Sequence, residues 1–419
     1  MSILAELLST VFERRQRMVQ AATSDGRPLE ELANALVGSA GETSGLALAG
    51  EILARFKTLD DDGKLAFFRH LASEMNIAPE DVRQTLDTYE KNPSRGSYRA
   101  FMAASEPRRQ ELVRRLNRLP NATGALVRMR ADLLRLGRGE PELEALDIDF
   151  RHLFLSWFNR GFLVLRPINW ESPAHILEKI IAYEAVHAID SWDDLRRRLE
   201  PEDRRCFAFF HPSMPDEPLI FVEVALTKGI PGSVQALLAQ DRAAMPAAEA
   251  DTATFYSISN CQAGLASISF GNSLIKQVAS DLAAELPGLS TFVTLSPIPG
   301  LITWAQSEGL AQEITGSDAT PETLRALAAH YLINAKRPGG LPYDPVARFH
   351  LGNGAIVHKV HADADTSDKG RAQSGGAMVN YLYDLQNVAQ NHERFATTQD
   401  VPASSEVKSL AAAARSLQA

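Results

Sequence analysis

The stretch that decides the fold begins with Thr252-Ala253-Thr254-Phe255-Tyr256-Ser257-Ile258-Ser259, a run rich in β-branched and aromatic residues that predicts a strand. A glycine-containing loop over 260–272 follows, and then a predicted helix over 273–286. Ser290-Thr291-Phe292-Val293-Thr294-Leu295 predicts the next strand. Such a loop delivers backbone N–H groups to a helix N-terminus, where a pyrophosphate can bind. A plain connection is at least as common a meaning, so the loop alone identifies no ligand.

Two more predicted strands lie upstream of this unit, over 206–210 and 219–226, with a proline-containing loop between them. Ser172-Pro173 predicts the start of a helix that continues to Tyr183. The chain before residue 155 shows helical periods, helix caps and almost no strand pattern. We therefore expect an α+β protein with an all-α first part and a mixed α/β second part.

The predicted helical part is crowded with arginines. Acidic residues are interspersed among them and no aromatic stacking platform accompanies them, so the pattern disfavours an RNA-binding face. We interpret it as a solvated or subunit-facing helical surface. The arginines concerned are Arg108, Arg109, Arg114, Arg115, Arg118, Arg128 and Arg130.

Charge and composition exclude several classes of protein. The chain carries 43 Lys+Arg against 52 Asp+Glu, a net charge of −9, which argues against electrostatic binding of nucleic acid. No apolar run approaches the roughly 18 residues of a membrane span. The first residues lack the pattern of a signal peptide, so we expect a soluble, cytoplasmic protein. Two cysteines are too few for a disulfide framework or a cysteine-based zinc site.

The sequence contains no P-loop, no G-x-G-x-x-G and no G-x-S-x-G motif, so the common nucleotide-binding and hydrolase sites are not indicated. The histidines and aspartates of 358–365 look like a metal cluster, but residues three apart in a strand point to opposite faces. Ser296 follows a predicted strand, where prolines stiffen the chain. His350 precedes an Asn353-Gly354 turn between predicted extended segments. By pattern alone, a turn-capping serine and a buried structural histidine are the commoner meanings of these two residues.

Several motifs in the second part resemble malonyl-CoA decarboxylase. The most specific are Leu295-Ser296-Pro297-Ile298-Pro299-Gly300 and His350-Leu351-Gly352-Asn353-Gly354-Ala355. The resemblance implies a helical oligomerisation domain over 1–155 and a catalytic domain over 156–419 that is similar to the GNAT acetyltransferases. The other matching stretches, in order along the chain, are Ser156–Leu163, Trp170–Ala174, Glu184–His187, Arg204–His211 and Met378–Tyr381.

The same resemblance implies a site. It places the family's catalytic serine and histidine at Ser296 and His350. Some members have a glutamate where this chain has Ser269, so we place no catalytic carboxylate there. A tyrosine near the carboxyl terminus also belongs to the family's site; Tyr381 and Tyr383 compete for this position, and we favour Tyr383. The acyl-CoA-binding loop falls on Ala266, Ser267, Ile268, Ser269, Phe270, Gly271 and Asn272.

The implied reaction converts malonyl-CoA to acetyl-CoA and CO2 through a thioester enolate that the Ser/His pair stabilises and protonates. The thioester itself accepts the electrons, so no cofactor or metal is expected. We expect a homo-oligomer, a dimer or tetramer, that binds neither nucleic acid nor membrane. Two alternatives remain open, a GNAT-type acyltransferase that needs an amine acceptor and a malonyl-CoA sensor without turnover.

Overall fold

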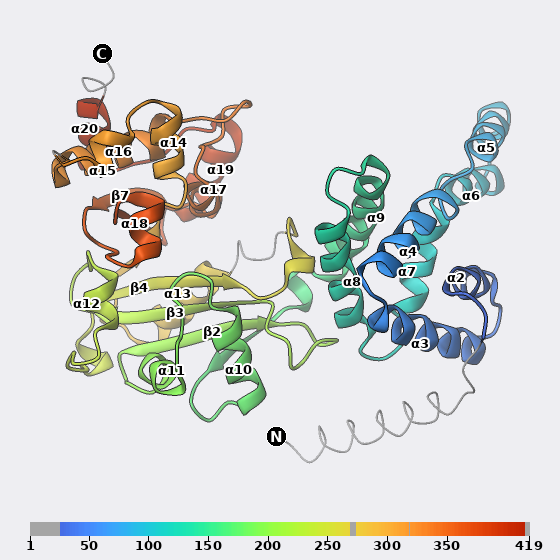
Figure 1. The fold of residues 1–419 in the computed structure, drawn as a ribbon, viewed down its shortest axis with the longest axis horizontal. Coiled ribbons are helices and arrows are strands. Elements are labelled where there is room, and N and C mark those ends of the chain that lie inside the picture. Colours follow the sequence, from blue (N-terminus) through green and yellow to red (C-terminus); the bar gives the residue numbers. More distant parts are fainter. Residues whose placement is uncertain (1–25, 269–273, 318, 415–419) are drawn as a thin grey trace. The chain divides into compact units, whose positions relative to one another are not determined.

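The computed structural model describes residues 26–268, 274–317 and 319–414 (Figure 1). Contacts divide the chain into two compact units. The first comprises the described chain up to Leu163 and the segments His211–Glu217 and 262–268, and the second holds the other described residues. The expected order, an all-α part followed by a mixed α/β part, is confirmed. No helix within the described ranges is both long and apolar enough to cross a membrane.

The first unit is built from α-helices. Phe56 packs against Phe67 and Phe68, with ring centroids 5.8 and 5.4 Å apart, and Leu71 continues this apolar stripe one turn later. Its helices are α2 (Leu29–Gly38), α3 (Glu42–Thr58), α4 (Asp61–Ser73), α5 (Pro79–Lys91), α6 (Arg95–Ala104), α7 (Arg108–Leu116), α8 (Ala122–Leu136), α9 (Pro141–Trp157), and the 3-10 helices η1 (Arg160–Phe162) and η3 (Ala263–Leu265).

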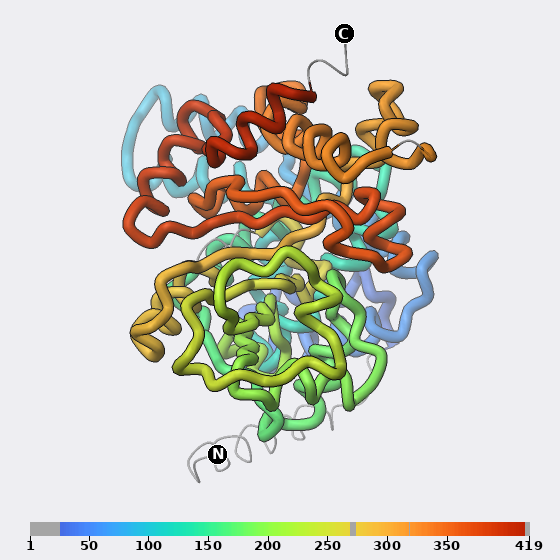
Figure 2. The backbone as a smooth tube through the Cα atoms, turned by 90° about the vertical axis from the view of Figure 1, so that its left-hand side faces the viewer, coloured from blue at the N-terminus to red at the C-terminus, as the bar shows by residue number. Residues whose placement is uncertain are grey.

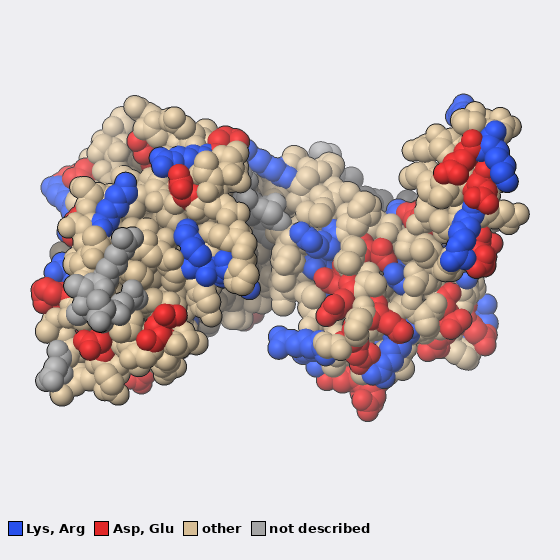
Figure 3. Space-filling model, turned by 90° about the horizontal axis from the view of Figure 1, so that it is seen from above, with Lys and Arg blue, Asp and Glu red and all other residues tan. Residues whose placement is uncertain are grey.

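Two arginines of this unit are buried, and for them the interpretation as a solvated or subunit-facing surface is wrong. Arg109 donates from Nε to Asp149 at 2.5 Å, and Arg130 donates from Nε to Asp147 at 2.7 Å. Carboxylates in hydrogen-bond range compensate for the loss of water around the two guanidinium groups. Elsewhere on the helical unit, basic and acidic side chains are interspersed on the surface (Figure 3).

The second unit is organised around an eight-stranded sheet of order β1-β2-β3-β4-β5-β8-β6, with β7 paired to β8. The β4–β5 pair is parallel and the other pairs are antiparallel. A parallel pair requires a crossover, which α13 (Leu274–Glu285) provides. Strands β2 to β5 confirm the four predicted strands. The bounds are β1 Val164–Ile168, β2 Arg204–Phe210, β3 Ile220–Thr227, β4 Thr252–Asn260, β5 Thr291–Thr294, β6 Ser296–Pro297, β7 Ile356–His361 and β8 Met378–Leu382.

Helices cover this sheet through apolar contacts. Ile176 and Ile180 of α10 (Ala174–Tyr183) pack with Ala208 and Phe221 of the strands. Helices α16 (Pro321–Asn334) and α20 (Ser405–Ala413) lie beside β7, and Figure 2 shows the carboxyl-terminal helices in red above the strands that precede them. The remaining elements are α11 Trp192–Leu199, α12 Val234–Leu238, η2 Ala247–Glu249, α14 Leu301–Ser307, α15 Ala311–Thr315, α17 Pro345–Gly352, α18 Asp368–Ser374 and α19 Val388–Thr398.

The sheet opens between β5 and β8. Val293 pairs with Leu382 and Ser296 pairs with Val379, but side chains bridge the two positions between these pairs. Asn380 Nδ2 donates to the Thr294 carbonyl at 2.8 Å. The Tyr381 backbone N–H donates to Thr294 Oγ1 at 3.2 Å. These bonds replace main-chain pairing and leave Ser296 at the edge of the opening.

Candidate active site

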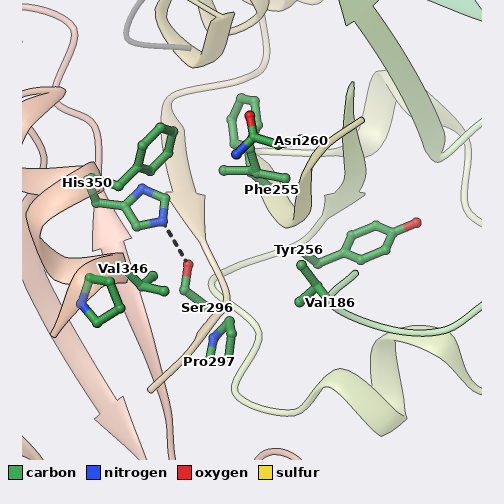
Figure 4. A pocket seen from close by; sticks show the side chains of 11 residues that line it. Val186, Phe255, Tyr256, Asn260, Ser296, Pro297, Val346 and His350 are labelled. Atoms are coloured by element: carbon green, nitrogen blue, oxygen red, sulfur yellow. Dashed lines mark hydrogen bonds between the residues drawn. The ribbon is translucent and has the colours of Figure 1, made fainter. Parts of the chain in front are cut away.

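A cavity of about 240 Å³ lies in the second unit, beside this opening (Figure 4). Strand β4 lines one wall, β6 contributes Ser296 and Pro297, and α17 contributes His350. Most of the lining is apolar, which is typical of a site that removes water from a ligand and orients it with few polar groups. The lining residues are Val186, Phe255, Tyr256, Ile258, Asn260, Ser296, Pro297, Pro345, Val346, Phe349 and His350.

The structure places two of the predicted site residues in contact. Ser296 Oγ lies 3.1 Å from His350 Nε2, although the two residues are 54 positions apart in the chain. Figure 4 shows both side chains pointing toward each other. Ser296 is 5% exposed and His350 is 2% exposed, so bulk water competes little for this hydrogen bond.

His350 lies in the last turn of helix α17, whereas the sequence pattern predicts extended segments on both sides of the Asn-Gly turn. That expectation is wrong on its amino-terminal side. Asp344 caps the helix by accepting from the Ala347 N–H, and Pro345 occupies the first turn. Asn353-Gly354 ends the helix instead of closing a hairpin, with Gly354 at a φ of 84°. The returning strand is β7, as expected.

Tyr383 is the tyrosine that bonds to His350. Its hydroxyl lies 2.8 Å from His350 Nδ1. Tyr381 contacts the same imidazole differently, because its ring stacks on it with centroids 4.4 Å apart. Both tyrosines therefore contact His350, and Tyr383 does so through a hydrogen bond that can select a tautomer.

Burial keeps the imidazole neutral. Loss of hydration lowers the pKa of His350 from 6.5 to about 3. Near neutral pH the ring therefore carries one N–H and one bare nitrogen. A neutral imidazole can donate a hydrogen bond but brings no positive charge to the site.

We expect His350 to remain uncharged between pH 5 and 8. Its native pKa lies below that of the unfolded chain, so the unfolded state binds more protons between about pH 6.5 and pH 3. His350 therefore lowers the free energy of unfolding progressively as the pH falls through this window, and it has no such effect above it. Histidine NMR titration checks this, with the His350 signal assigned by its loss in His350→Gln. A midpoint near 6.5 for this signal would contradict the prediction.

One wall of the cavity comes from the segment that follows α10. The Glu184 carboxylate accepts hydrogen bonds from the backbone N–H groups of Val186 and His187 at 2.7 and 2.8 Å. It also accepts from the Ser257 hydroxyl on β4. Lys369 donates to the Ala185 carbonyl. These contacts hold the Val186 side chain against the cavity.

The predicted acyl-CoA-binding loop is described only in part, because Ser269, Phe270, Gly271 and Asn272 lie outside the described residues. In the first unit, Arg130 Nη1 donates to the carbonyls of Gly264 and Ala266 at 2.7 and 2.9 Å. Ser267 has a φ of 63°, and Ile268 is buried. The start of the loop is thus held by a buried arginine. Among the described residues, no group of three or more His, Cys, Asp or Glu side chains could hold a metal ion.

Sequence reasoning did not single out three residues of the site, two that line the cavity and one that contacts Ser296 from behind it. Thr294 accepts the Ser296 hydroxyl at 2.8 Å, and its position two residues before Ser296 places both side chains on one face of the strand. Asn260 is a polar residue at the end of β4 that lines the cavity. Val186 belongs to a quoted motif, but nothing in the pattern indicates where its side chain lies.

Comparison with known proteins identifies the family. The family model for the malonyl-CoA decarboxylase C-terminal domain matches residues 161–319 and 306–419, and that for the N-terminal domain matches 76–158. The mitochondrial malonyl-CoA decarboxylase of Anser anser anser is 36% identical over 352 residues, which cover 72% of this chain and 69% of the relative.

Solved structures agree with the sequence matches. The crystal structure of malonyl-CoA decarboxylase from Rhodopseudomonas palustris aligns with a TM-score of 0.86 and 46% identity, covering 91% of this chain and 98% of that chain. The Agrobacterium vitis malonyl-CoA decarboxylase aligns with a TM-score of 0.86 and 47% identity, covering 91% and 99%. Both domain models and both bacterial structures lead to one conclusion: the chain belongs to the malonyl-CoA decarboxylase family.

Proposed function

We propose that this protein decarboxylates malonyl-CoA to acetyl-CoA and CO2 in the cavity that Ser296 and His350 line. The observation that carries the proposal is the hydrogen-bonded Ser296–His350–Tyr383 chain beside an apolar cavity, in a member of this family. The antiparallel β2–β3–β4 run followed by the parallel β4–β5 pair supports the expected similarity of the second unit to GNAT acetyltransferases.

The chemistry needs an oxyanion donor and a proton. When the bond between C2 and the malonyl carboxylate breaks, its electron pair moves into the thioester and CO2 leaves. The resulting enolate carries negative charge on the thioester oxygen, which a fixed hydrogen-bond donor stabilises. A proton from solvent, passed on by the Ser296–His350 pair, then adds to C2. A neutral His350 suits the role of donor to that oxygen through Nε2–H.

Ser296 can hold the substrate in a reactive orientation. Its hydroxyl lies at the cavity surface, and on substrate binding its proton can turn from Thr294 Oγ1 to the malonyl carboxylate or the thioester oxygen. Either contact can keep the scissile bond out of the carbonyl plane, where it overlaps the developing π system. Tyr383 does not line the cavity, and we assign it the positioning of His350.

The apolar walls of the cavity favour the loss of CO2 from the malonyl carboxylate. Val186, Ile258, Val346 and Phe349 offer the carboxylate little compensation for lost hydration. An ionised carboxylate is costly in such surroundings, whereas the CO2 that it becomes is neutral. The negative charge moves to the thioester oxygen, which can accept hydrogen bonds from Ser296 and His350.

The proposal is tested by incubating the protein with malonyl-CoA alone in the presence of EDTA. We expect CO2 release and acetyl-CoA identified by mass, because neither a metal nor a second substrate is required. An acyltransferase would release no CO2 from malonyl-CoA alone and would transfer the acyl group once an amine is added. A sensor would bind malonyl-CoA without producing acetyl-CoA, and that result would refute the proposal.

We further propose that residues 266–272 bind the coenzyme A moiety and that 156–419 form the catalytic domain. The Arg130 contacts at the start of the loop support the first of these assignments, because a fixed anchor point lowers the entropy lost on binding. A cytoplasmic location remains a prediction.

We also propose that the helical domain over 1–155 joins copies of this chain through the α5–α6 hairpin. None of the residues of α5 and α6 is buried. Tyr89 packs against Tyr98 within the hairpin, while Leu86, Tyr98 and Met102 are 36%, 51% and 49% exposed. Several large apolar side chains exposed on one hairpin are typical of an interaction site.

Charges on this hairpin should weaken assembly. We expect Tyr98→Glu with Met102→Glu to lower the mass of the particle in light scattering by at least about twofold, as when a symmetric dimer or tetramer separates. Leu341→Glu, at an exposed apolar residue of the second unit, serves as the matched control. Unchanged mass in the correctly folded double variant would rule out the hairpin as the interface.

A further inference from the structure

Thr294 connects Ser296 to strand β8. It is the last residue of β5 and is fully buried. Its Oγ1 accepts the Tyr381 backbone N–H at 3.2 Å and the Ser296 hydroxyl at 2.8 Å. A backbone N–H can only donate, so the Tyr381 contact orients the acceptor side of the threonine hydroxyl. A hydroxyl oxygen has a second lone pair, and this one receives the Ser296 proton.

The contact completes a chain of four side chains: Tyr383, His350, Ser296 and Thr294. A serine hydroxyl has one proton to donate. If Ser296 donates to Thr294, it must accept from His350, which requires the imidazole proton on Nε2. The bare Nδ1 then accepts the Tyr383 hydroxyl proton. With Ser296 as the donor to Thr294, this direction satisfies all three bonds of the chain and leaves the Nε2–H on the side of Ser296 and the cavity.

If the hydrogen bonds of the chain ran in the opposite direction, His350 would have no N–H at Nε2. If the Ser296 proton turned to Nε2, the imidazole proton would lie on Nδ1 and point to Tyr383. Nε2 would then be an acceptor and could not stabilise an enolate oxygen. The tautomer of a histidine is set by the hydrogen bonds at its two nitrogens, so the partner of the Ser296 proton decides which form is present.

We propose that Thr294 is a positioning residue that sets the tautomer of His350 through Ser296. The assignment of the tautomer stands on the hydrogen-bond geometry, and its effect on the rate rests on the proposed function. Thr294 itself does not line the cavity, so its influence passes through Ser296.

The test compares variants that remove or keep the hydroxyl. We expect Thr294→Val to lower kcat for malonyl-CoA by about 10-fold, the scale of one net hydrogen bond, with KM within about twofold. Thr294→Ser keeps the hydroxyl and should restore most of the activity. Thr254→Val is the matched control, because Thr254 is a fully buried β4 threonine whose hydroxyl contacts Thr227 and not the Ser296–His350 pair.

The tautomer of His350 can be measured by NMR without any measurement of decarboxylation. In protein with 15N-labelled histidine, long-range 1H–15N correlation spectra distinguish the two tautomers, and His350→Gln assigns the signal. We expect Nε2–H in the wild type and in Thr294→Ser, and a shift toward Nδ1–H in Thr294→Val. Thr294→Ala removes the hydroxyl without placing a methyl group against the Tyr381 N–H and should show the same shift if Thr294→Val fails to fold.

The outcomes are distinct. Wild-type protein that releases no CO2 would refute the proposed function and leave the tautomer measurement intact. A wild-type tautomer in the hydroxyl-deleting variants would overturn the proposal, whatever the activity. Equal impairment of Thr294→Ser and Thr294→Val would also overturn it, because packing and not the hydroxyl would then explain the loss.

Discussion

Replacing His350 by alanine should lower kcat for malonyl-CoA decarboxylation by about 10²-fold or more while KM changes little, the typical scale for a lost acid–base or oxyanion group. The hydrogen bond from His350 to substrate should strengthen only as negative charge develops on the thioester oxygen. An interaction of that kind lowers the barrier without improving ground-state binding. Substrate affinity should therefore survive the substitution.

Steady-state kinetics and circular dichroism measure the effect. His392→Ala is a useful control, because His392 Nδ1 contacts the Gly352 carbonyl at the end of α17 but does not line the cavity. Its activity should stay within a few-fold of the wild type. If a correctly folded His350→Ala variant still released CO2 at close to the wild-type rate, His350 would not be part of the chemistry.

Ser296→Ala should affect both kcat and KM, because the serine contacts His350 and can also contact the substrate. Its removal leaves His350 Nε2 and Thr294 Oγ1 without the hydroxyl that joins them. We expect a loss in kcat of at least about 10-fold together with a rise in KM. Ser269→Ala, in the predicted coenzyme A loop, should mainly raise KM.

The double variant distinguishes one shared site from two independent ones. Since both side chains would act on the same transition state, Ser296→Ala with His350→Ala should lose less than the product of the single losses. Kinetic constants for the four proteins complete the cycle. Fully multiplicative losses would mean that the two residues act separately, in conflict with their hydrogen bond.

The predicted strands were recognisable because their apolar and β-branched runs are local. Strands β2 to β5 and helix α13 follow the predicted ranges to within a few residues. Helix α17 shows where local patterns fail. Asp344-Pro345 is a helix start and Gly352 ends the helix only eight residues later, and the Asn353-Gly354 pair is equally typical of a hairpin.

The residues of the site were harder to identify from sequence patterns than the strands were. Ser296 and His350 stood out through their resemblance to a family, since a serine beside prolines and a histidine near a turn have commoner structural meanings. Tyr381 and Tyr383 compete for one position in the sequence, and the resemblance favours Tyr383. Residues two apart in a strand share a face, and only the position of α17 shows that one bonds the imidazole and the other stacks on it.

Three features could be predicted from the sequence: the order of the helical and mixed parts, the strands around the central crossover and the family to which the motifs belong. Those features depend on periodicity and on short contiguous motifs, which are local properties of a chain. The Ser296–His350 contact, the position of Thr294 at the opening between β5 and β8, and the depressed pKa of His350 became visible in the folded structure. Hydrogen-bond partners and burial depend on residues distant in sequence, and packing alone brings those residues together.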